Sequence, residues 1–201
     1  RSAGKMPSSG VVWWTPVIGP WLCNRGSRVG IRSGWPRMHK LEKARDAGNI
    51  LRYHGWPTIQ TQTNAHHTWN VMRIYAELFG WPIAEVASYI HYHDVGELDT
   101  GDISFVVKRN HPEVKKITGP IEDAAMERLS LGYATSDMIG SIEKTKVKIC
   151  DLMEMLEFSL EEMRLGSRHY GWMIFENIYH ALVELEVPDH LSSHLVWQIA
   201  D

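Results

Sequence analysis

The chain has 201 residues, enough for one ordinary domain, and its 44% apolar and 22% charged residues are typical of a globular protein. Its formal charge of −3 hides an asymmetry, because residues 1–41 hold seven Lys and Arg and no acid, which leaves 14 basic and 24 acidic residues for the rest. This acidic body argues against broad binding to a nucleic-acid backbone, and the absence of any run of about 18 apolar residues argues against a membrane span.

The N-terminal segment differs in composition from everything that follows it. Residues 1–37 are rich in Gly, Ser, Pro, Arg and Trp and show neither a helical nor a sustained strand period, whereas ordinary helix-forming sequence begins at Met38. We interpret 1–37 as an irregular extension that is non-native or disordered, with Met38 as the natural start. The alternative is a native arm whose four tryptophans dock on the body or on a partner such as nucleic acid.

From Met38 onward the spacing of apolar residues predicts helices, and strand patterns are almost absent. Residues 95–111 are predicted to be loop and short turns. The predicted helices cover 66–79, 83–94, a short segment opening at Pro112, a segment from Gly119-Pro120 to near Gly132, 139–165, 170–186 and 189–199. Residues 38–201 are therefore predicted to form a single all-α helical bundle. The two cysteines of the whole chain, Cys23 and Cys150, cannot build a disulfide framework, so we expect a reducing, cytoplasmic setting.

Two histidines lie on apolar helix faces. In the helix predicted at 66–79, His67 shares a stripe with Val71 and Ile74, whereas His66 points to the polar face. His93 and Asp94 close an apolar helix, and His91 lies on a different face of it. A lone inward histidine is more often a hydrogen-bonded core residue than a ligand, so neither position alone decides the matter.

A carboxylate also stands where an apolar side chain is expected. Asp151 lies within KVKICDLMEMLEF, with Val147, Met155 and Phe158 on its own face. A carboxylate in such a segment is costly unless it is paired, hydrogen-bonded or metal-bound. A buried arginine could pair with it. Taken with the histidines, however, two imidazoles and two carboxylates from three helices predict one divalent cation, and this mixed set suits Mn, Fe, Co, Ni or Zn.

These residues resemble the signature of the HD-domain superfamily of metal-dependent phosphohydrolases, a His, then a His-Asp pair, then a distant Asp. The local sequence around these residues is similar to that of the 5′-deoxynucleotidases and the phage dATP triphosphohydrolases. Three segments carry the resemblance: RYHGWPTIQTQTNAHHTWNV (52–71), YHDVGELDTGDISFVVKR (92–109) and VKICDLMEMLEF (147–158). The resemblance implies a single HD-domain helical bundle. It also implies that one divalent cation is held by His67, His93, Asp94 and Asp151.

The same resemblance implies roles around the substrate. Arg52 would bind the phosphate, and Tyr53 stands where the family often has a tryptophan packed against the sugar. Glu97 matches an acidic residue near the attacking water or the leaving oxygen, with Asp94 beside it at the metal. Asp102 and Lys108 match positions that line the sugar and the phosphate.

The function implied is metal-dependent hydrolysis of deoxynucleoside 5′-phosphates, with a 5′-deoxynucleotidase acting on dNMPs as the lead hypothesis. A dNTP triphosphohydrolase is the alternative, because Lys108, Arg109, His111, Lys115 and Lys116 form a basic run that could hold a longer phosphate tail. A catalytically inactive nucleotide-sensing module is the second alternative. The partner is then a small deoxynucleotide, the setting is the host cytoplasm if the chain is phage-encoded, and a homodimer is implied by the family.

Overall fold

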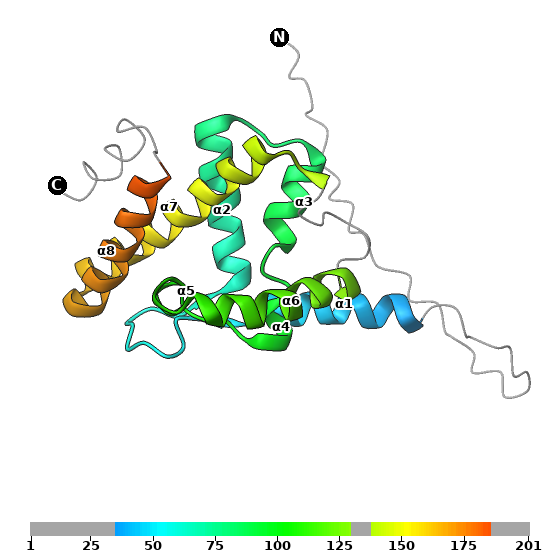
Figure 1. Cartoon of the computed structure of the whole chain (residues 1–201), viewed down its shortest axis with the longest axis horizontal. Coiled ribbons are helices and arrows are strands. Elements are labelled where there is room, and N and C mark those ends of the chain that lie inside the picture. The colour runs from blue at the N-terminus through cyan, green and yellow to red at the C-terminus, as the bar shows by residue number, and fades with distance from the viewer. Residues whose placement is uncertain (1–34, 130–137, 186–201) are drawn as a thin grey trace, which may run out of the picture. The chain divides into compact units, whose positions relative to one another are not determined.

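The computed structural model describes residues 35–129 and 138–185, all within a compact unit that spans 34–201. Helices dominate this described part, and its only strands are two residues long, so the predicted all-α class is confirmed. The elements are α1 (Trp35–Gly48), β1 (Leu51–Arg52), β2 (Gln62–Thr63), α2 (Asn64–Phe79), α3 (Ala84–Tyr92), α4 (Glu97–Thr100), α5 (Phe105–Asn110), α6 (Pro112–Leu129), α7 (Ser141–Leu165) and α8 (Arg168–Glu184) (Figure 1).

Most predicted helices lie within a few residues of the observed ones. The stretch 95–111 was predicted as loop, but it contains the short helices α4 and α5. Helix α1 begins at Trp35, three residues before the predicted boundary at Met38. The helix predicted at 189–199 and the irregular extension before α1 lie outside the described residues.

The predicted helix break at Gly119-Pro120 is wrong, because α6 runs through it. Pro120 has no N–H to donate, so the helix loses one hydrogen bond at this point. Its buried face nevertheless continues on both sides of the proline, with Thr118 before it and Ala125 and Met126 after it. Packing of this face against α4 and α5 holds the two halves in one helix.

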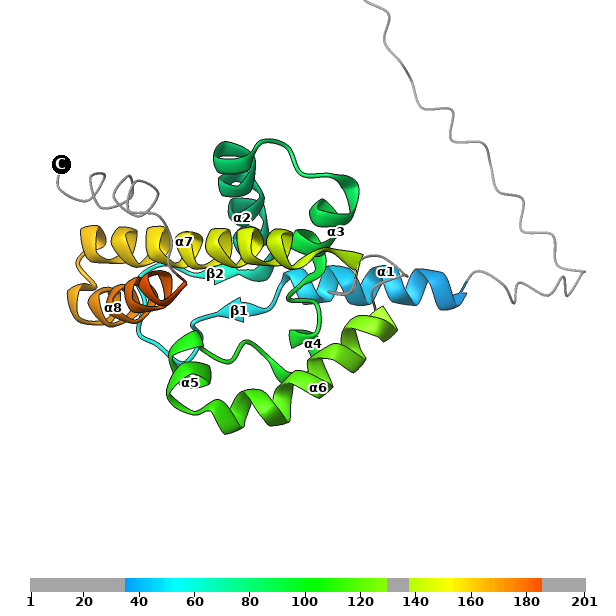
Figure 2. The same cartoon turned by 45° about the horizontal axis from the view of Figure 1, so that its top comes forward.

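The main apolar core lies between α2, α3, α7 and α8. Helix α7 contacts α2 and runs beside α8, as Figures 1 and 2 show. Thr63 caps α2 by accepting a hydrogen bond from the backbone N–H of His66, which fixes where the helix begins. Gly166, at φ 112°, closes α7 in the left-handed conformation that favours glycine, and α8 starts two residues later.

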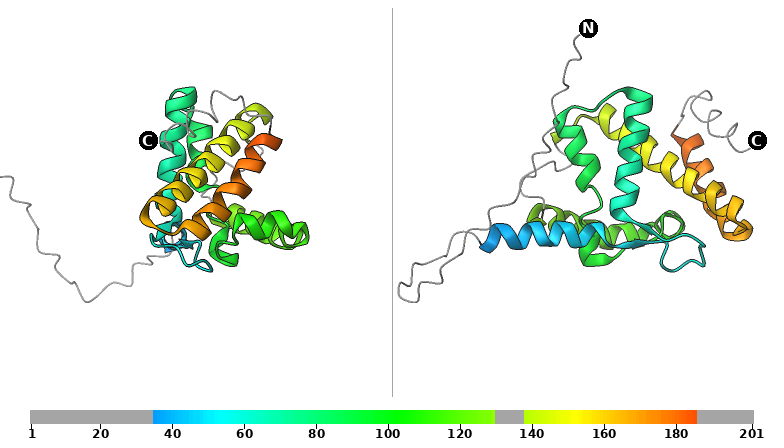
Figure 3. Two further views of the ribbon diagram at one scale, coloured as in Figure 1. Left: turned by 90° about the vertical axis from the view of Figure 1, so that its left-hand side faces the viewer. Right: turned by 180° about the vertical axis from the view of Figure 1, so that it is seen from behind.

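A second, smaller core joins α1, α4 and α6. It contains Ala47, Val95, Ala125, Met126 and Leu129. Ile90, near the end of α3, belongs to the main core, whereas Val95, just after α3, belongs to the smaller one. The view from behind in Figure 3 shows α1 beside α4 and α6. Val95 fixes the segment that links α3 to α4 to the smaller core, and this segment carries two of the predicted site residues, His93 and Asp94.

The short hairpin before α2 has a defined register. Leu51 pairs with Thr63, and Arg52 pairs with Gln62, in antiparallel orientation. Tyr53, directly after β1, has a φ of 55°, which is uncommon for a residue with a side chain. No described helix is both long enough and apolar enough to cross a membrane.

Gly96 has no side chain, and this allows α6 to approach the segment between α3 and α4 closely. A Cβ at this position would lie 2.5 Å from the backbone oxygen of Glu122, so Gly96→Ala must push α6 away. We expect a loss of about 1–3 kcal/mol in the free energy of unfolding, measured by denaturant titration. The matched control is Gly55→Ala, where nothing lies within 4 Å of the added atom, and its change should stay within about 0.5 kcal/mol. Equal effects of the two variants would contradict the close approach.

Candidate metal centre and substrate cavity

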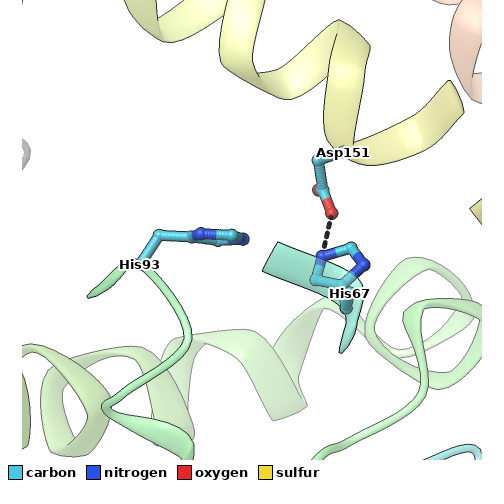
Figure 4. A group of neighbouring side chains, drawn as sticks. All are labelled: His67, His93 and Asp151. Atoms are coloured by element: carbon cyan, nitrogen blue, oxygen red, sulfur yellow. Dashed lines mark ion pairs between the residues drawn. The ribbon is translucent and has the colours of Figure 1, made fainter. Parts of the chain in front are cut away.

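His67 is fully buried on α2, and its two ring nitrogens have different surroundings. Its Nδ1 lies 2.5 Å from Glu154 Oε2, so this nitrogen carries the proton and donates it to the carboxylate. Its Nε2 lies 3.1 Å from Asp151 Oδ1 on α7 and makes no hydrogen bond. Figure 4 shows the imidazole and the Asp151 carboxylate pointing toward each other. An unprotonated Nε2 can face a carboxylate at this distance only if positive charge lies between them.

His93 approaches the same point from the end of α3. Its Nδ1 donates to the backbone oxygen of Ile90 at 2.7 Å, which leaves Nε2 as the acceptor. This Nε2 is also buried and without a hydrogen-bond partner. Candidate ligand atoms of His67, His93 and Asp151 all lie within 4.8 Å of one another. Two oriented, unpartnered imidazole nitrogens beside a carboxylate fit a divalent cation of the transition series.

Asp94, the fourth predicted ligand, lies beside this cluster. Its Oδ1 is 3.3 Å from His93 Nε2, and its Oδ2 is 3.6 Å from His67 Nε2. The Oδ2 atom also accepts a hydrogen bond of 2.7 Å from Arg52 Nη1. Asp94 therefore joins the candidate metal ligands to the arginine predicted to bind phosphate.

The charges of the cluster shift the pKa values of its members. Burial and the positive charge of Arg52 lower the pKa of His67, but the carboxylates of Glu154 and Asp151 outweigh them and raise it to about 9. Burial raises the pKa of Asp151, but Lys148 and the imidazole of His67 hold it well below the usual range. In the absence of a cation, a proton on His67 supplies the positive charge that this cluster requires.

A cavity of about 330 Å³ opens beside the cluster, large enough for a small ligand. Seven of the predicted site residues line it: Arg52, His93, Asp94, Glu97, Asp102, Lys108 and Asp151. His67 lies behind the wall of this cavity rather than on it.

Glu97 is a buried carboxyl at the edge of the cavity. Its Oε2 accepts a hydrogen bond of 2.9 Å from Asn64 Nδ2, and its Oε1 lies 3.6 Å from Lys108 Nζ. Burial raises the pKa of Glu97 to about 8, and the negative charge of Asp94 adds to the rise. A carboxyl that titrates near neutral pH beside a candidate metal site is suited to proton transfer.

Several solved structures have a fold similar to this one. An HD-domain phosphohydrolase from Listeria innocua matches at 19% sequence identity and a TM-score of 0.65, over 82% of this chain and 90% of that one. The HD phosphohydrolase DatZ of cyanophage S-2L, solved with dA and one catalytic Zn²⁺ ion, matches at 19% identity and a TM-score of 0.56, over 79% of this chain and 93% of that one. The chain has the HD-domain fold.

A protein of Pyrococcus horikoshii OT3 is similar to the same extent, with 16% identity and a TM-score of 0.56 over 81% of this chain and 98% of that one. No protein-family profile matches the sequence, and no curated protein sequence matches it. The similarity therefore comes from the arrangement of the helices.

The Tyr53 side chain lies in the core and not on the wall of the cavity. Its ring is buried and stacks on Phe158, with 4.7 Å between the ring centroids and 1° between the planes, and it is not among the residues that line the cavity. The positive φ turns this side chain into the core, while its backbone N–H donates to Asp102 Oδ2 at 2.9 Å. Tyr53 thus orients Asp102 through its backbone, while its ring packs in the core.

Four residues of the site were not singled out in the sequence. Lys144 and Lys148 line the cavity from α7, and Lys148 donates to Asp151 Oδ2 at 2.6 Å. Glu122 lines the cavity from α6, and Glu154 accepts a hydrogen bond from Nδ1 of His67. The spacing of the lysines three and seven residues before Asp151 places them on its helix face, a signal that could have identified them. His66 and His91 are exposed, as their helix phase predicts.

The raised pKa of His67 predicts how metal binding depends on pH. A cation needs the unprotonated Nε2, so below about pH 9 it must displace a proton from the imidazole. Asp151 is already ionised in this range. We expect the affinity of metal-free protein for Zn²⁺ or Co²⁺ to rise by up to about tenfold per pH unit between pH 6 and 8 and to level off near 9, measured by competition with a chelator of known pH dependence. A flat profile between pH 6 and 8 would contradict this account.

Proposed function

We propose that this chain is a metal-dependent phosphohydrolase that acts on deoxynucleoside 5′-phosphates, with dNMPs as the lead substrates. The observation that carries the proposal is the pair of buried imidazole nitrogens, without hydrogen-bond partners, that meet two carboxylates beside a cavity lined by Arg52 and Lys108. Two structures of similar fold are HD phosphohydrolases, and one of them holds dA and a catalytic Zn²⁺ ion. A cytoplasmic setting and a homodimer belong to the same proposal.

Four residues would hold the cation: His67, His93, Asp94 and Asp151. When bound, a divalent ion of this kind would draw charge from a phosphoryl oxygen and lower the pKa of a water molecule toward neutrality. The histidines can serve without rearrangement because each Nδ1 is already engaged, by Glu154 for His67 and by the Ile90 carbonyl for His93.

Arg52 is placed to bind the phosphate next to the cation site. Its Nη1 donates to Asp94, whereas its buried Nε has no hydrogen-bond partner. A buried donor without a partner is costly, and a phosphate oxygen would satisfy it with a charge-assisted hydrogen bond. Lys108 lies 3.6 Å from Glu97 and 3.5 Å from Glu122, and it supplies a second positive charge at the cavity.

Glu97 would move the proton. With a pKa raised to about 8 it holds a proton at neutral pH in the metal-free protein, and Asn64 fixes the direction of its carboxyl. From this position it can donate to the leaving 5′ oxygen or orient the attacking water. Asp102, held by the backbone of Tyr53, offers the sugar a hydrogen-bond acceptor on the same wall.

A dNTP triphosphohydrolase is the second candidate, and one observation favours it. Lys115, Lys144 and Lys148 line the cavity in addition to Lys108, which is more positive charge than one phosphate needs. Of the predicted basic run, Arg109 instead pairs with Glu184, and His111 with Glu113. A nucleotide sensor without activity is less well supported, because the candidate ligands His93, Asp94 and Asp151 line one cavity together with Arg52 and Glu97.

A substrate panel tests the proposed function. The protein is incubated with Mn²⁺ or Co²⁺ and with dNMPs, NMPs and dNTPs, and the released phosphate, pyrophosphate and triphosphate are resolved. We expect phosphate from dNMPs and little from NMPs. Triphosphate from dATP would establish the second candidate instead, and the absence of turnover with every substrate and metal would contradict both enzymatic proposals.

Two isosteric variants separate proton transfer from metal binding. Glu97→Gln should retain the cation and lose about 10²–10⁴-fold in kcat, because it removes the titrating proton. Asp151→Asn should lose both the cation and the activity, because the amide replaces a charged ligand. Metal content and kcat are measured on the same samples. Full activity of Glu97→Gln would remove Glu97 from the mechanism.

A further inference from the structure

Glu154 is a buried carboxylate that the proposed chemistry does not use. It lies on α7, three residues after Asp151, and is 2% exposed. Its two oxygens bond to different elements: Oε2 to the His67 imidazole on α2 and Oε1 to the Gln62 side chain on β2, at 2.6 Å. No lysine or arginine pairs with it among the described residues. A carboxylate buried in this way is costly, and here it joins two parts of the site.

The contact with His67 decides which nitrogen faces the candidate ligands. A carboxylate only accepts hydrogen bonds, so Nδ1 of the imidazole keeps its proton, and Nε2 is the nitrogen that faces Asp94 and Asp151 and is available to a cation. A carboxylate on the far nitrogen also makes an imidazole more basic and so a stronger metal ligand.

The contact with Gln62 links Glu154 to Arg52, the residue proposed to bind the phosphate. Gln62 is 2% exposed and pairs with Arg52 across the β1–β2 hairpin. Its side-chain amide donates to Glu154, which ties β2 to α7 and thereby fixes the strand that carries Arg52. Helix α7 itself carries Asp151, so one turn of this helix holds a candidate metal ligand and the anchor of the arginine.

We propose that Glu154 is a positioning residue that orients His67 for the cation and, through Gln62, sets the place of Arg52 relative to it. The proposal rests on the metal-dependent activity proposed above. Glu154 is not among the residues that line the substrate cavity, so it acts through these two neighbours. Metal affinity depends on the first contact, and phosphate binding depends on the second.

Helix α7 offers a matched control. Glu162 is a fully buried carboxylate two turns further along, and it accepts hydrogen bonds of 2.7 Å from the backbone N–H groups of Ile59 and Gln60. It has the same burial and charge as Glu154 but contacts no candidate ligand. Glu162→Gln therefore reports the cost of changing a buried carboxylate on this helix without changing His67.

The first test measures the affinity of metal-free protein for Co²⁺ or Zn²⁺ by chelator competition. We expect Glu154→Gln to weaken the affinity by about 10–100-fold and to change the visible spectrum of the Co²⁺ form, whereas Glu162→Gln stays within about threefold with an unchanged spectrum. Equal affinities of wild type and Glu154→Gln would overturn the proposal. This readout needs no substrate, so it remains decisive even if the substrate panel fails.

Gln62→Leu tests the second contact alone. It removes the donor to Glu154 and keeps the carboxylate on His67, so we expect metal affinity within about threefold of wild type and a KM raised about tenfold or more. An unchanged KM would overturn the link to Arg52. If Glu154→Gln does not fold, ¹⁵N NMR of the Zn²⁺-loaded wild type decides the first link: a protonated Nδ1 and a metal-bound Nε2 on His67 are expected, and the reverse would overturn it.

Discussion

Two imidazole nitrogens and two carboxylates that share one buried space repel one another unless positive charge lies among them. In this chain both Nε2 atoms are fixed toward the space by hydrogen bonds on Nδ1, so neither can turn away. The metal-free protein meets the constraint with a proton on His67, whose pKa is raised to about 9, and with Arg52 on Asp94. A divalent cation would neutralise the carboxylates more completely than this proton does. The proposed chemistry depends on the replacement of the proton on His67 by the cation.

The arrangement of the helices brings the two imidazoles and the two carboxylates together from three directions. His67 comes from the first turn of α2, His93 and Asp94 from the residues that follow α3, and Asp151 from α7. The contacts of α7 with α2 and of α2 with α3 bury the apolar faces on which these residues stand. The second core places Glu97 on α4, and Gly96 lets α6 come close enough for Glu122 to share Lys108 with it. Stability and site geometry therefore depend on the same contacts.

Helix phase predicted the positions of the histidines well, because a 3.6-residue period ties each residue to a face, and His67 is buried whereas His66 is exposed. Three features escaped prediction for physical reasons. The continuity of α6 through Pro120 depends on packing on both sides of the proline, which local propensity does not register. The inward turn of Tyr53 follows from its positive φ, which is rare outside glycine. The role of Glu154 depends on which residues α7 meets in space, and no spacing along the chain shows that.

The central claim is a mixed imidazole and carboxylate site for one divalent cation. X-ray absorption at the zinc edge of the Zn²⁺-loaded protein tests it directly, since the ring atoms of bound imidazoles give a distinct scattering pattern. The account predicts one zinc per chain with two imidazole nitrogens at about 2.0–2.1 Å, the remaining ligands being oxygen, and the same spectrum in a His66→Ala variant. A shell of oxygen alone, a sulfur ligand, or a spectrum that loses an imidazole in His66→Ala would contradict it.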